Sequence, residues 1–153
     1  MKKLLVLALL ISNAQAATTG SLLLQGIILP TRSITVTAVS GVNTNLDLTT
    51  TQTDLKVATV NEKSNSILGY KVTITSLNLS KLKRSGGTEV FPYTLKYNEI
   101  SAPVSTVAGY SVTYPAGLVN VNRDLDISYT GVSAETLVEG TYQDTLTLTI
   151  SAP

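Results

Sequence analysis

Residues 145–150 read Thr-Leu-Thr-Leu-Thr-Ile, a strict alternation of threonine with a large apolar residue. Successive side chains of an extended chain point to opposite faces. Leu146, Leu148 and Ile150 therefore fall on one face, and the threonines fall on the other. This period of two predicts a β-strand that buries its apolar face, so we expect these three side chains to point into a core.

The same alternation recurs along the chain, and turn residues separate the runs at fairly even spacing. The expected strands cover residues 34–38, 46–48, 57–60, 70–75, 91–97, 125–129 and 145–150, with a further apolar run at 22–29. The turn signals between them are Ser40 with Gly41, Ser64 with Asn65, Gly86 with Gly87, Ala116 with Gly117, and Glu139 with Gly140. Seven or eight short strands with turns between them predict an all-β, antiparallel β-sandwich.

Length and composition indicate one exported domain. The chain has 153 residues, enough for a single hydrophobic core. Lys2 and Lys3 precede an unbroken apolar run at residues 4–11, and Ala14 and Ala16 form a small-x-small cleavage site. This pattern is typical of a secretory signal peptide, and the apolar run is too short to span a bilayer. We therefore expect a signal peptide at 1–16, an N-terminal extension at 17–30 and one sandwich domain at 31–153.

The composition excludes most catalytic chemistry. The chain has no Cys and no His, which removes cysteine nucleophiles, histidine bases, disulfides and the usual zinc ligands. It contains no phosphate-binding loop and no nucleophile motif, so we expect no enzyme activity, no cofactor and no metal. A net charge of +1 gives no electrostatic footprint for nucleic acid.

Three weaker patterns allow a binding role, each beside a simpler structural explanation. Asp124 and Asp126 share one face of a strand and could hold calcium, but we interpret them as a solvated face. The basic run at 81–84 could bind anionic glycans or lipopolysaccharide, but we interpret it as a solvated loop. Seven tyrosines could form a sugar platform. Most of them fall on the apolar side of their strands, so we interpret them as core.

The two ends of the chain carry a family resemblance. At the N-terminal end, Leu22, Leu24, Gly26 and Ile28 point one way along an extended strand, with a small residue among them. At the C-terminal end, the Gly-x-Tyr-x-Asp run at 140–144 precedes the alternating strand. Together with the signal peptide, this pattern resembles pilin subunits of the chaperone–usher pathway. The likeness is greatest to the archaic and alternative branches, including the spore-coat-U-like secreted proteins. Many pilins carry a disulfide that this chain lacks.

The resemblance implies an immunoglobulin-like sandwich that lacks its last strand. The acceptor groove would then lie between the first and last core strands, with Ile34, Val36, Leu146, Leu148 and Ile150 on its edges. A periplasmic chaperone would fill this groove first, and the N-terminal extension of another copy or another pilin would replace it at an outer-membrane usher. In that extension, Leu22, Leu24 and Ile28 would be the plugs, and Gly26 would be the small residue. Three buried aliphatic side chains contribute on the order of 5–9 kcal/mol.

The resemblance also implies where in the cell the protein would be found, and it leaves one rival interpretation of the domain. The protein would cross the inner membrane, pass through the periplasm, and end in a surface fibre or be secreted. The rival is a self-complete secreted or surface binding module with an unknown ligand, in which residues 22–28 fold back as the domain's own strand. The residues alone do not separate action in cis from action in trans.

Overall fold

The computed structural model describes residues 19–153. The predicted signal peptide and the first two residues of the predicted extension lie outside this range. The described secondary structure is β apart from one turn of 3-10 helix, η1 (Ala134–Thr136). The strands are β1 (Arg32–Ala38), β2 (Gln52–Ser64), β3 (Tyr70–Ser76), β4 (Lys81–Arg84), β5 (Val90–Pro92), β6 (Thr94–Tyr97), β7 (Ile100–Ser101), β8 (Tyr110–Tyr114), β9 (Val119–Tyr129), β10 (Tyr142–Gln143) and β11 (Leu146–Ser151).

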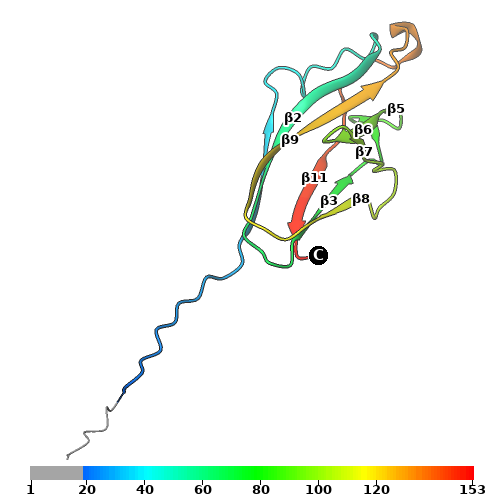
Figure 1. Ribbon diagram of the computed structural model, residues 1–153. Coiled ribbons are helices and arrows are strands. Elements are labelled where there is room, and N and C mark those ends of the chain that lie inside the picture. The colour runs from blue at the N-terminus through cyan, green and yellow to red at the C-terminus, as the bar shows by residue number, and fades with distance from the viewer. Residues whose placement is uncertain (1–18) are drawn as a thin grey trace, which may run out of the picture.

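The strands form two antiparallel layers, which confirms the predicted immunoglobulin-like sandwich (Figure 1). One layer is a five-stranded sheet in the order β1-β2-β9-β6-β7. The other layer consists of two three-stranded sheets, β11-β3-β8 and β10-β4-β5. The chain passes from one three-stranded sheet to the other between β3 and β4, where Leu79 and Ser80 adopt positive φ angles of 58° and 62°. These angles break the ladder and end the sheet at that point.

One hydrophobic core lies between the layers. It is built from alternate residues, because only one face of each strand points inward. Phe91 of β5 packs edge to face on Tyr129 of β9, with ring centroids 5.5 Å apart, and so joins the two layers. The predicted inward tyrosines are confirmed as core. The buried apolar residues are Val57, Ala58, Val60, Tyr70, Val72, Ile74, Leu82, Phe91, Tyr93, Leu95, Tyr97, Ala102, Val104, Leu125, Ile127 and Tyr129.

The sandwich has two distinct ends. The lower pole consists of turns 65–69 and 115–118, together with the start of β1. The two turns are joined by a hydrogen bond of 3.1 Å from Gly117 N to the Ser66 carbonyl oxygen. The upper pole consists of loops 39–51 and 130–141, the second of which contains η1. β1 and β3 run toward the upper pole, whereas β11 runs toward the lower pole.

Three local expectations within the sandwich were wrong. The single strand expected at 91–97 is two strands, β5 and β6, which belong to different sheets. Residues 46–48 form no strand, because the Asp47 carboxylate accepts hydrogen bonds from Thr49 and Thr50 and holds the chain in a turn that begins at Leu48. Leu46 and Leu48 still pack against the core. The basic run expected in a loop is instead strand β4, which pairs with β5 and β10.

Strand β8 was not anticipated. It is the outer strand beside β3, and its aromatic residues are only partly buried. Its sequence, Tyr-Ser-Val-Thr-Tyr, does alternate with a period of two. The expected turns all lie between strands or at the end of one.

Residues 19–31 carry no secondary structure and lead away from the lower pole. An apolar run at 22–29 meets the sequence requirement for a strand, but a strand also needs a partner to satisfy its backbone hydrogen bonds. Within the described chain, no strand pairs with this segment.

Candidate functional site

The candidate site is an open groove between β1 and β11. β1 pairs with β2 only, and β11 pairs with β3 only, so each strand is the last of its sheet. The two strands lie beside one another in space, but no ladder joins them. Each therefore presents a row of unpaired backbone donors and acceptors to the gap, and such edges are templates for another strand.

Apolar side chains from both layers form the floor of this groove. A hollow of about 200 Å³ opens between the two edge strands. Val36 is 46% exposed there, a high value for a valine on the inward face of a strand. The lining is Val36, Ala38, Asn43, Leu46, Val57, Ala58, Leu82, Tyr93, Leu125, Ile127, Asp144 and Leu146. The gap thus exposes side chains of the hydrophobic core.

The residues predicted for the groove edges lie on those edges. Val36 and Leu146 line the hollow itself. Ile34, Leu148 and Ile150 are partly buried and pack against the core from the two edge strands. The threonines of β11 are exposed, so the predicted alternation of faces in the last strand is confirmed.

Asp144 holds the upper end of β11 in place. Its carboxylate accepts hydrogen bonds from Ser76 Oγ at 2.6 Å and from the Tyr93 hydroxyl at 2.7 Å. It also accepts from the backbone N–H groups of Asn78 at 2.9 Å and Thr145 at 2.7 Å. Burial, reinforced by the hydrogen bond to Asp144, raises the pKa of Tyr93 well above its usual range. The aspartate of the Gly-x-Tyr-x-Asp run therefore fixes the start of β11 against the β3–β4 turn.

Several lining residues were not predicted for the site. Val57, Leu82 and Leu125 carry the alternation of ordinary core strands, and nothing local distinguishes them from fully enclosed residues. Their position in the groove depends on which strand edges stay unpaired. Asp144 carried a signal in the sequence, since it ends the Gly-x-Tyr-x-Asp run directly before the alternating strand.

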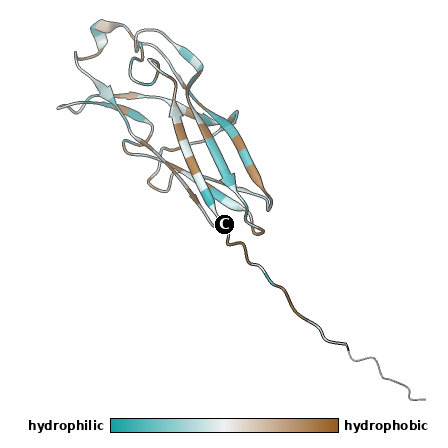
Figure 2. Ribbon diagram, turned by 90° about the vertical axis from the view of Figure 1, so that its left-hand side faces the viewer, coloured by the Kyte–Doolittle hydropathy of each residue, from teal (hydrophilic) through white to brown (hydrophobic). Residues whose placement is uncertain are grey.

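The structure does not bring the predicted donor residues to the groove. Leu22, Leu24 and Ile28 are more than 80% exposed, and no atom of another part of the chain lies within 4 Å of a Cβ built on Gly26. Figure 2 shows this apolar segment leaving the sandwich in an extended form. Its last residues are held at the lower pole by Asn65, whose side chain donates to the Leu29 carbonyl oxygen at 3.1 Å. The Asn65 side-chain oxygen accepts from Thr31 N at 2.6 Å.

A wider hollow of about 750 Å³ continues the groove at the upper pole. It shares Asn43, Leu46, Leu82 and Asp144 with the groove. Its remaining walls come from loops 39–51 and 130–141 and from β10, with Leu48, Leu137, Val138 and Tyr142 as the larger apolar side chains. The groove and this hollow form one continuous recess.

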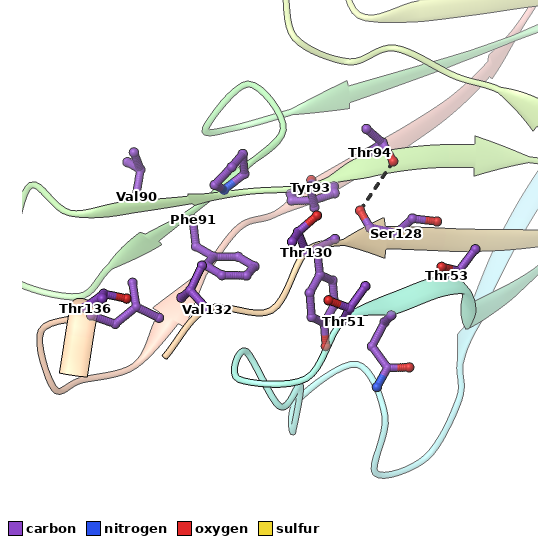
Figure 3. Close-up of a pocket in the computed structure, with 14 residues that line it drawn as sticks. Thr51, Thr53, Val90, Phe91, Tyr93, Thr94, Ser128, Thr130, Val132 and Thr136 are labelled. Atoms are coloured by element: carbon purple, nitrogen blue, oxygen red, sulfur yellow. Dashed lines mark hydrogen bonds between the residues drawn. The ribbon is translucent and has the colours of Figure 1, made fainter. Parts of the chain in front are cut away.

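A separate hollow of about 560 Å³ lies on the other side of η1 (Figure 3). Its aromatic residues Phe91, Tyr93 and Tyr129 are buried in the core, so they offer little open ring surface for stacking. Hydroxyl groups such as those of Thr51 and Thr130 surround it, and no charged side chain lines it. This arrangement indicates a surface depression above the core.

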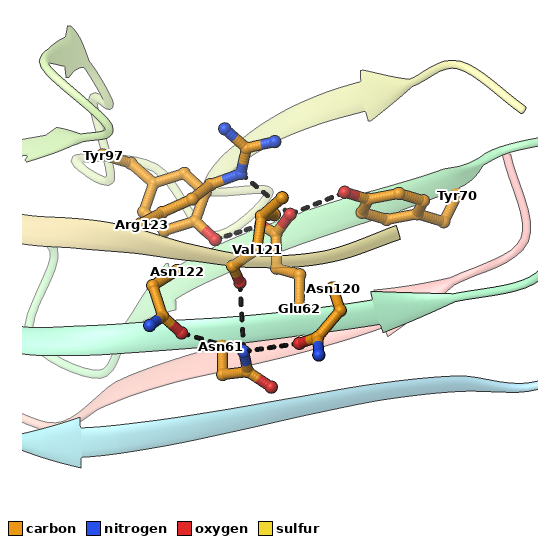
Figure 4. Close-up of polar contacts among 8 residues, drawn as sticks. All are labelled: Asn61, Glu62, Tyr70, Tyr97, Asn120, Val121, Asn122 and Arg123. Atoms are coloured by element: carbon orange, nitrogen blue, oxygen red, sulfur yellow. Dashed lines mark hydrogen bonds and ion pairs between the residues drawn. The ribbon is translucent and has the colours of Figure 1, made fainter. Parts of the chain in front are cut away.

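A buried ion pair lies between the layers near the lower pole (Figure 4). Glu62 is fully buried and accepts hydrogen bonds from Arg123 Nε at 2.8 Å, from the Tyr70 hydroxyl at 2.7 Å and from the Tyr97 hydroxyl. The Arg123 guanidinium stacks 4.0 Å from the ring centroid of Tyr114. Burial and the Glu62 carboxylate raise the pKa of Tyr97. The charge of Glu62 is therefore compensated from three sides, as a buried carboxylate requires.

Three further ion pairs lie at the surface. Asp124 bonds Lys56 at 2.6 Å, Arg84 of the basic run bonds Glu89 at 2.7 Å, and Lys96 bonds Asp54 at 2.7 Å. Burial, followed by the nearby Asp124, raises the pKa of Asp126. Within residues 19–153, no group of three or more acidic residues is placed to hold a metal ion. No helix in that range is long and apolar enough to cross a membrane.

No family model matches the sequence, and no curated protein matches it. Among solved structures, the chain is similar to the minor tip subunit HdaB of the E. coli Hda pilus. The identity is 15% and the TM-score is 0.42, with 77% of this chain and 79% of that chain covered. A likeness of this size carries no argument about function, so the function must be inferred from the groove and the N-terminal segment.

Proposed function

We propose that this chain is a structural subunit of a bacterial surface fibre, in which the N-terminal segment of one copy fills the groove of the next. The observation that carries the proposal is the coexistence, in one chain, of an unfilled apolar groove and an unpartnered apolar segment. The groove and the segment both favour aggregation when they are exposed. The segment is a strand that could cover the groove, and the groove has the unpaired edges that the segment needs.

The dimensions of the two parts support this pairing. Residues 22–29 span about 26 Å as an extended strand, and the six residues of β11 span about 20 Å. The recess also continues beyond β11 into the hollow at the upper pole. The segment is therefore long enough to line the whole edge, with Leu22, Leu24, Gly26 and Ile28 on the face that enters the groove.

The link between segment and domain favours insertion into a neighbour over folding back. β1 begins at Arg32, directly after Thr31. For the segment to lie beside β1 of its own domain, the chain would have to reverse within residues 29–31. The hydrogen bonds to Asn65 hold these same residues at the lower pole, where they lead outward.

The remaining parts of the proposal follow from the open groove. A subunit whose core is exposed needs a temporary occupant until assembly, which a periplasmic chaperone would supply, and an outer-membrane usher would direct the exchange. The contact joins the N-terminal segment of one copy to the groove of another, so it is heterologous and generates a fibre. The neighbours are further copies or other pilins, and the subunit has no catalytic role.

The test adds the same side chain to the two faces of the segment. Gly26→Leu places a large group on the face predicted to enter the groove, whereas Gln25→Leu places it on the opposite face. Both positions are exposed in the single chain, so neither substitution disturbs the domain itself. Deletion of residues 20–28 removes all four predicted donor residues, Leu22, Leu24, Gly26 and Ile28. Each variant is expressed together with a chaperone and an usher of the chaperone–usher pathway, and fibres are scored as ladders that resist detergent at room temperature.

We expect Gln25→Leu to form ladders like the parent protein. Gly26→Leu and the deletion should yield folded chaperone complexes without ladders. Normal ladders from the deletion variant would overturn the proposal. Loss of the folded domain in that variant would indicate a segment that acts in cis, as in a self-complete binding module.

A further inference from the structure

The proposed fibre brings a second pair of surfaces of neighbouring copies together, and this contact rests on the proposed function. The tether between segment and domain is very short, since Asn65 binds the carbonyl of Leu29, the last residue of the apolar run. A hydrogen bond of 3.3 Å from Asn65 N to the Thr31 carbonyl oxygen adds to this attachment. A copy whose segment is inserted in a groove must therefore have its lower pole at the mouth of that groove.

The direction of insertion determines which pole of the acceptor this mouth is. β11 runs toward the lower pole. A segment that pairs antiparallel to β11 ends at the upper pole, and the domain that donates it then sits there. The opposite direction would place the donating domain at the lower pole, where the extension of the acceptor itself leaves. The two would then compete for the same space, so the antiparallel direction is the one that propagates.

The lower pole carries an exposed apolar surface. Ile67 and Leu68 occupy the tip of turn 65–69, and Leu118 lies in the adjoining turn. All three side chains are at least 76% exposed. Large apolar side chains gathered at one end of a domain mark a site of contact with another protein. We name Ile67, Leu68 and Leu118 the apolar tips.

The upper pole offers a complementary surface. The 750 Å³ hollow lies at the mouth of the groove, and Leu48, Leu137, Val138 and Tyr142 contribute to its walls. It is continuous with the groove, so a domain whose segment emerges there faces the hollow directly.

The charges of the two poles are also opposite in sign. Residues 29–33, 63–71 and 113–121 at the lower pole contain Arg32, Lys63 and Lys71 and no acidic residue. Loops 39–51 and 130–141 at the upper pole contain Asp47, Glu135 and Glu139 and no basic residue. The side chain of Arg84 lies beside Gly140 of the second loop, but it is paired with Glu89. Complementary charges favour the encounter of a lower pole with an upper pole and disfavour contacts between like poles.

We propose that the apolar tips of one copy dock in the upper-pole hollow of the copy whose groove holds its N-terminal segment. The occupant of the hollow is thus a second copy of this chain. The contact stiffens the fibre at each junction, because it adds a second attachment between two domains that the inserted strand alone would join only through residues 29–31.

Engineered cysteines give the sharpest test, because the native chain has no cysteine and any disulfide must come from the new pair. One variant carries Leu68→Cys with Val138→Cys, which the proposal places on opposite sides of one junction. The control carries Val107→Cys with Val138→Cys. Val107 is as exposed as the tips but lies in the loop before β8, on the side of the domain. Fibres are oxidised and boiled in detergent, so that only covalent ladders survive.

A covalent ladder from the first variant and not from the control is the expected result. A second measurement compares Leu68→Asp with Val107→Asp. The charge at position 68 should speed detergent-induced dissociation of assembled fibres about tenfold or more, since it replaces a buried leucine contact, and the charge at 107 should leave the rate unchanged.

Three outcomes would overturn the inference. Fibres that form normally but give no covalent ladder from the first variant would show that the poles do not meet, and would leave the proposed function intact. Equal cross-linking by the control pair, or equal dissociation rates for Leu68→Asp and Val107→Asp, would do the same. Absence of any polymer from the parent protein would remove the proposed function and this contact together.

Discussion

Val36 of β1 and Leu146 of β11 line the same hollow, although no hydrogen bond joins the strands that carry them. In a closed sandwich, side chains at such positions would be covered by a strand that pairs with both edges. Here Val36 stays 46% exposed, and residues 32–153 place no strand between the two edges. The groove is therefore an open gap between two unpaired strand edges, and its floor consists of side chains of the hydrophobic core.

The facing of the last strand predicts very different effects at neighbouring positions. Leu148→Asp places a charge where the side chain packs against the core, and it should prevent accumulation of folded protein at a cost of several kcal/mol. Thr147→Asp places the same charge on the exposed face and should be nearly neutral. Immunoblots of the periplasmic fraction after limited proteolysis would compare the two. Equal accumulation would mean that the assigned facing is wrong.

The buried ion pair predicts a second matched comparison. Arg123→Ala leaves the Glu62 carboxylate buried with only its two tyrosine partners, so it should lower the free energy of unfolding by about 3–5 kcal/mol. Lys56→Ala removes the partner of Asp124 in an exposed pair and should cost less than about 1 kcal/mol. Urea titration of the purified protein, followed by circular dichroism, measures both. If the two substitutions lowered the free energy of unfolding by similar amounts, burial would not explain the importance of the Glu62–Arg123 pair.

The tyrosine environments predict a loss of stability in alkaline solution. Burial raises the pKa of Tyr114 to about 12 and raises those of four other tyrosines. The unfolded value is close to 10. Between pH 10 and the folded pKa values, the folded state binds more protons than the unfolded state, so stability falls as the pH rises through this window and is unaffected below it. The other four are Tyr70, Tyr93, Tyr97 and Tyr129.

This pH effect can be followed directly. Ultraviolet titration should show that these phenol groups ionise together with the unfolding seen by circular dichroism. Independent ionisation of all seven tyrosines near pH 10 in a folded protein would contradict it.

The N-terminal pattern predicts the start of the exported protein. Cleavage after Ala16 leaves Ala17 as the first residue, and it keeps the whole apolar segment at 22–29 on the mature chain. Intact-mass measurement of exported material checks this. A retained Met1, or cleavage downstream of residue 22, would contradict both the leader and the availability of the segment.

Much of the fold was readable from local periodicity. The alternation at 145–150 and at 70–75 predicted the strands and the faces that point inward, because side-chain direction along a strand depends only on neighbouring residues. Where the prediction from the sequence was wrong, the local structure is determined by hydrogen bonds that the alternation of apolar and polar residues does not encode. The hydrogen bonds of Asp47 place the alternating run at 46–48 in a loop. Pairing with β5 and β10 makes the basic run at 81–84 a strand.

The candidate site, too, could be predicted from the sequence only in part. The apolar character of residues 22–29 and the inward faces of Ile34, Val36, Leu146, Leu148 and Ile150 follow from the order of residues alone. The order of strands in each sheet does not, because it depends on pairings between residues far apart in the chain, such as Val60 with Arg123. That order leaves β1 and β11 as neighbouring unpaired edges and exposes Leu82 and Leu125 between them. A core residue and a groove residue carry the same local pattern, and only the three-dimensional arrangement of the strands separates them.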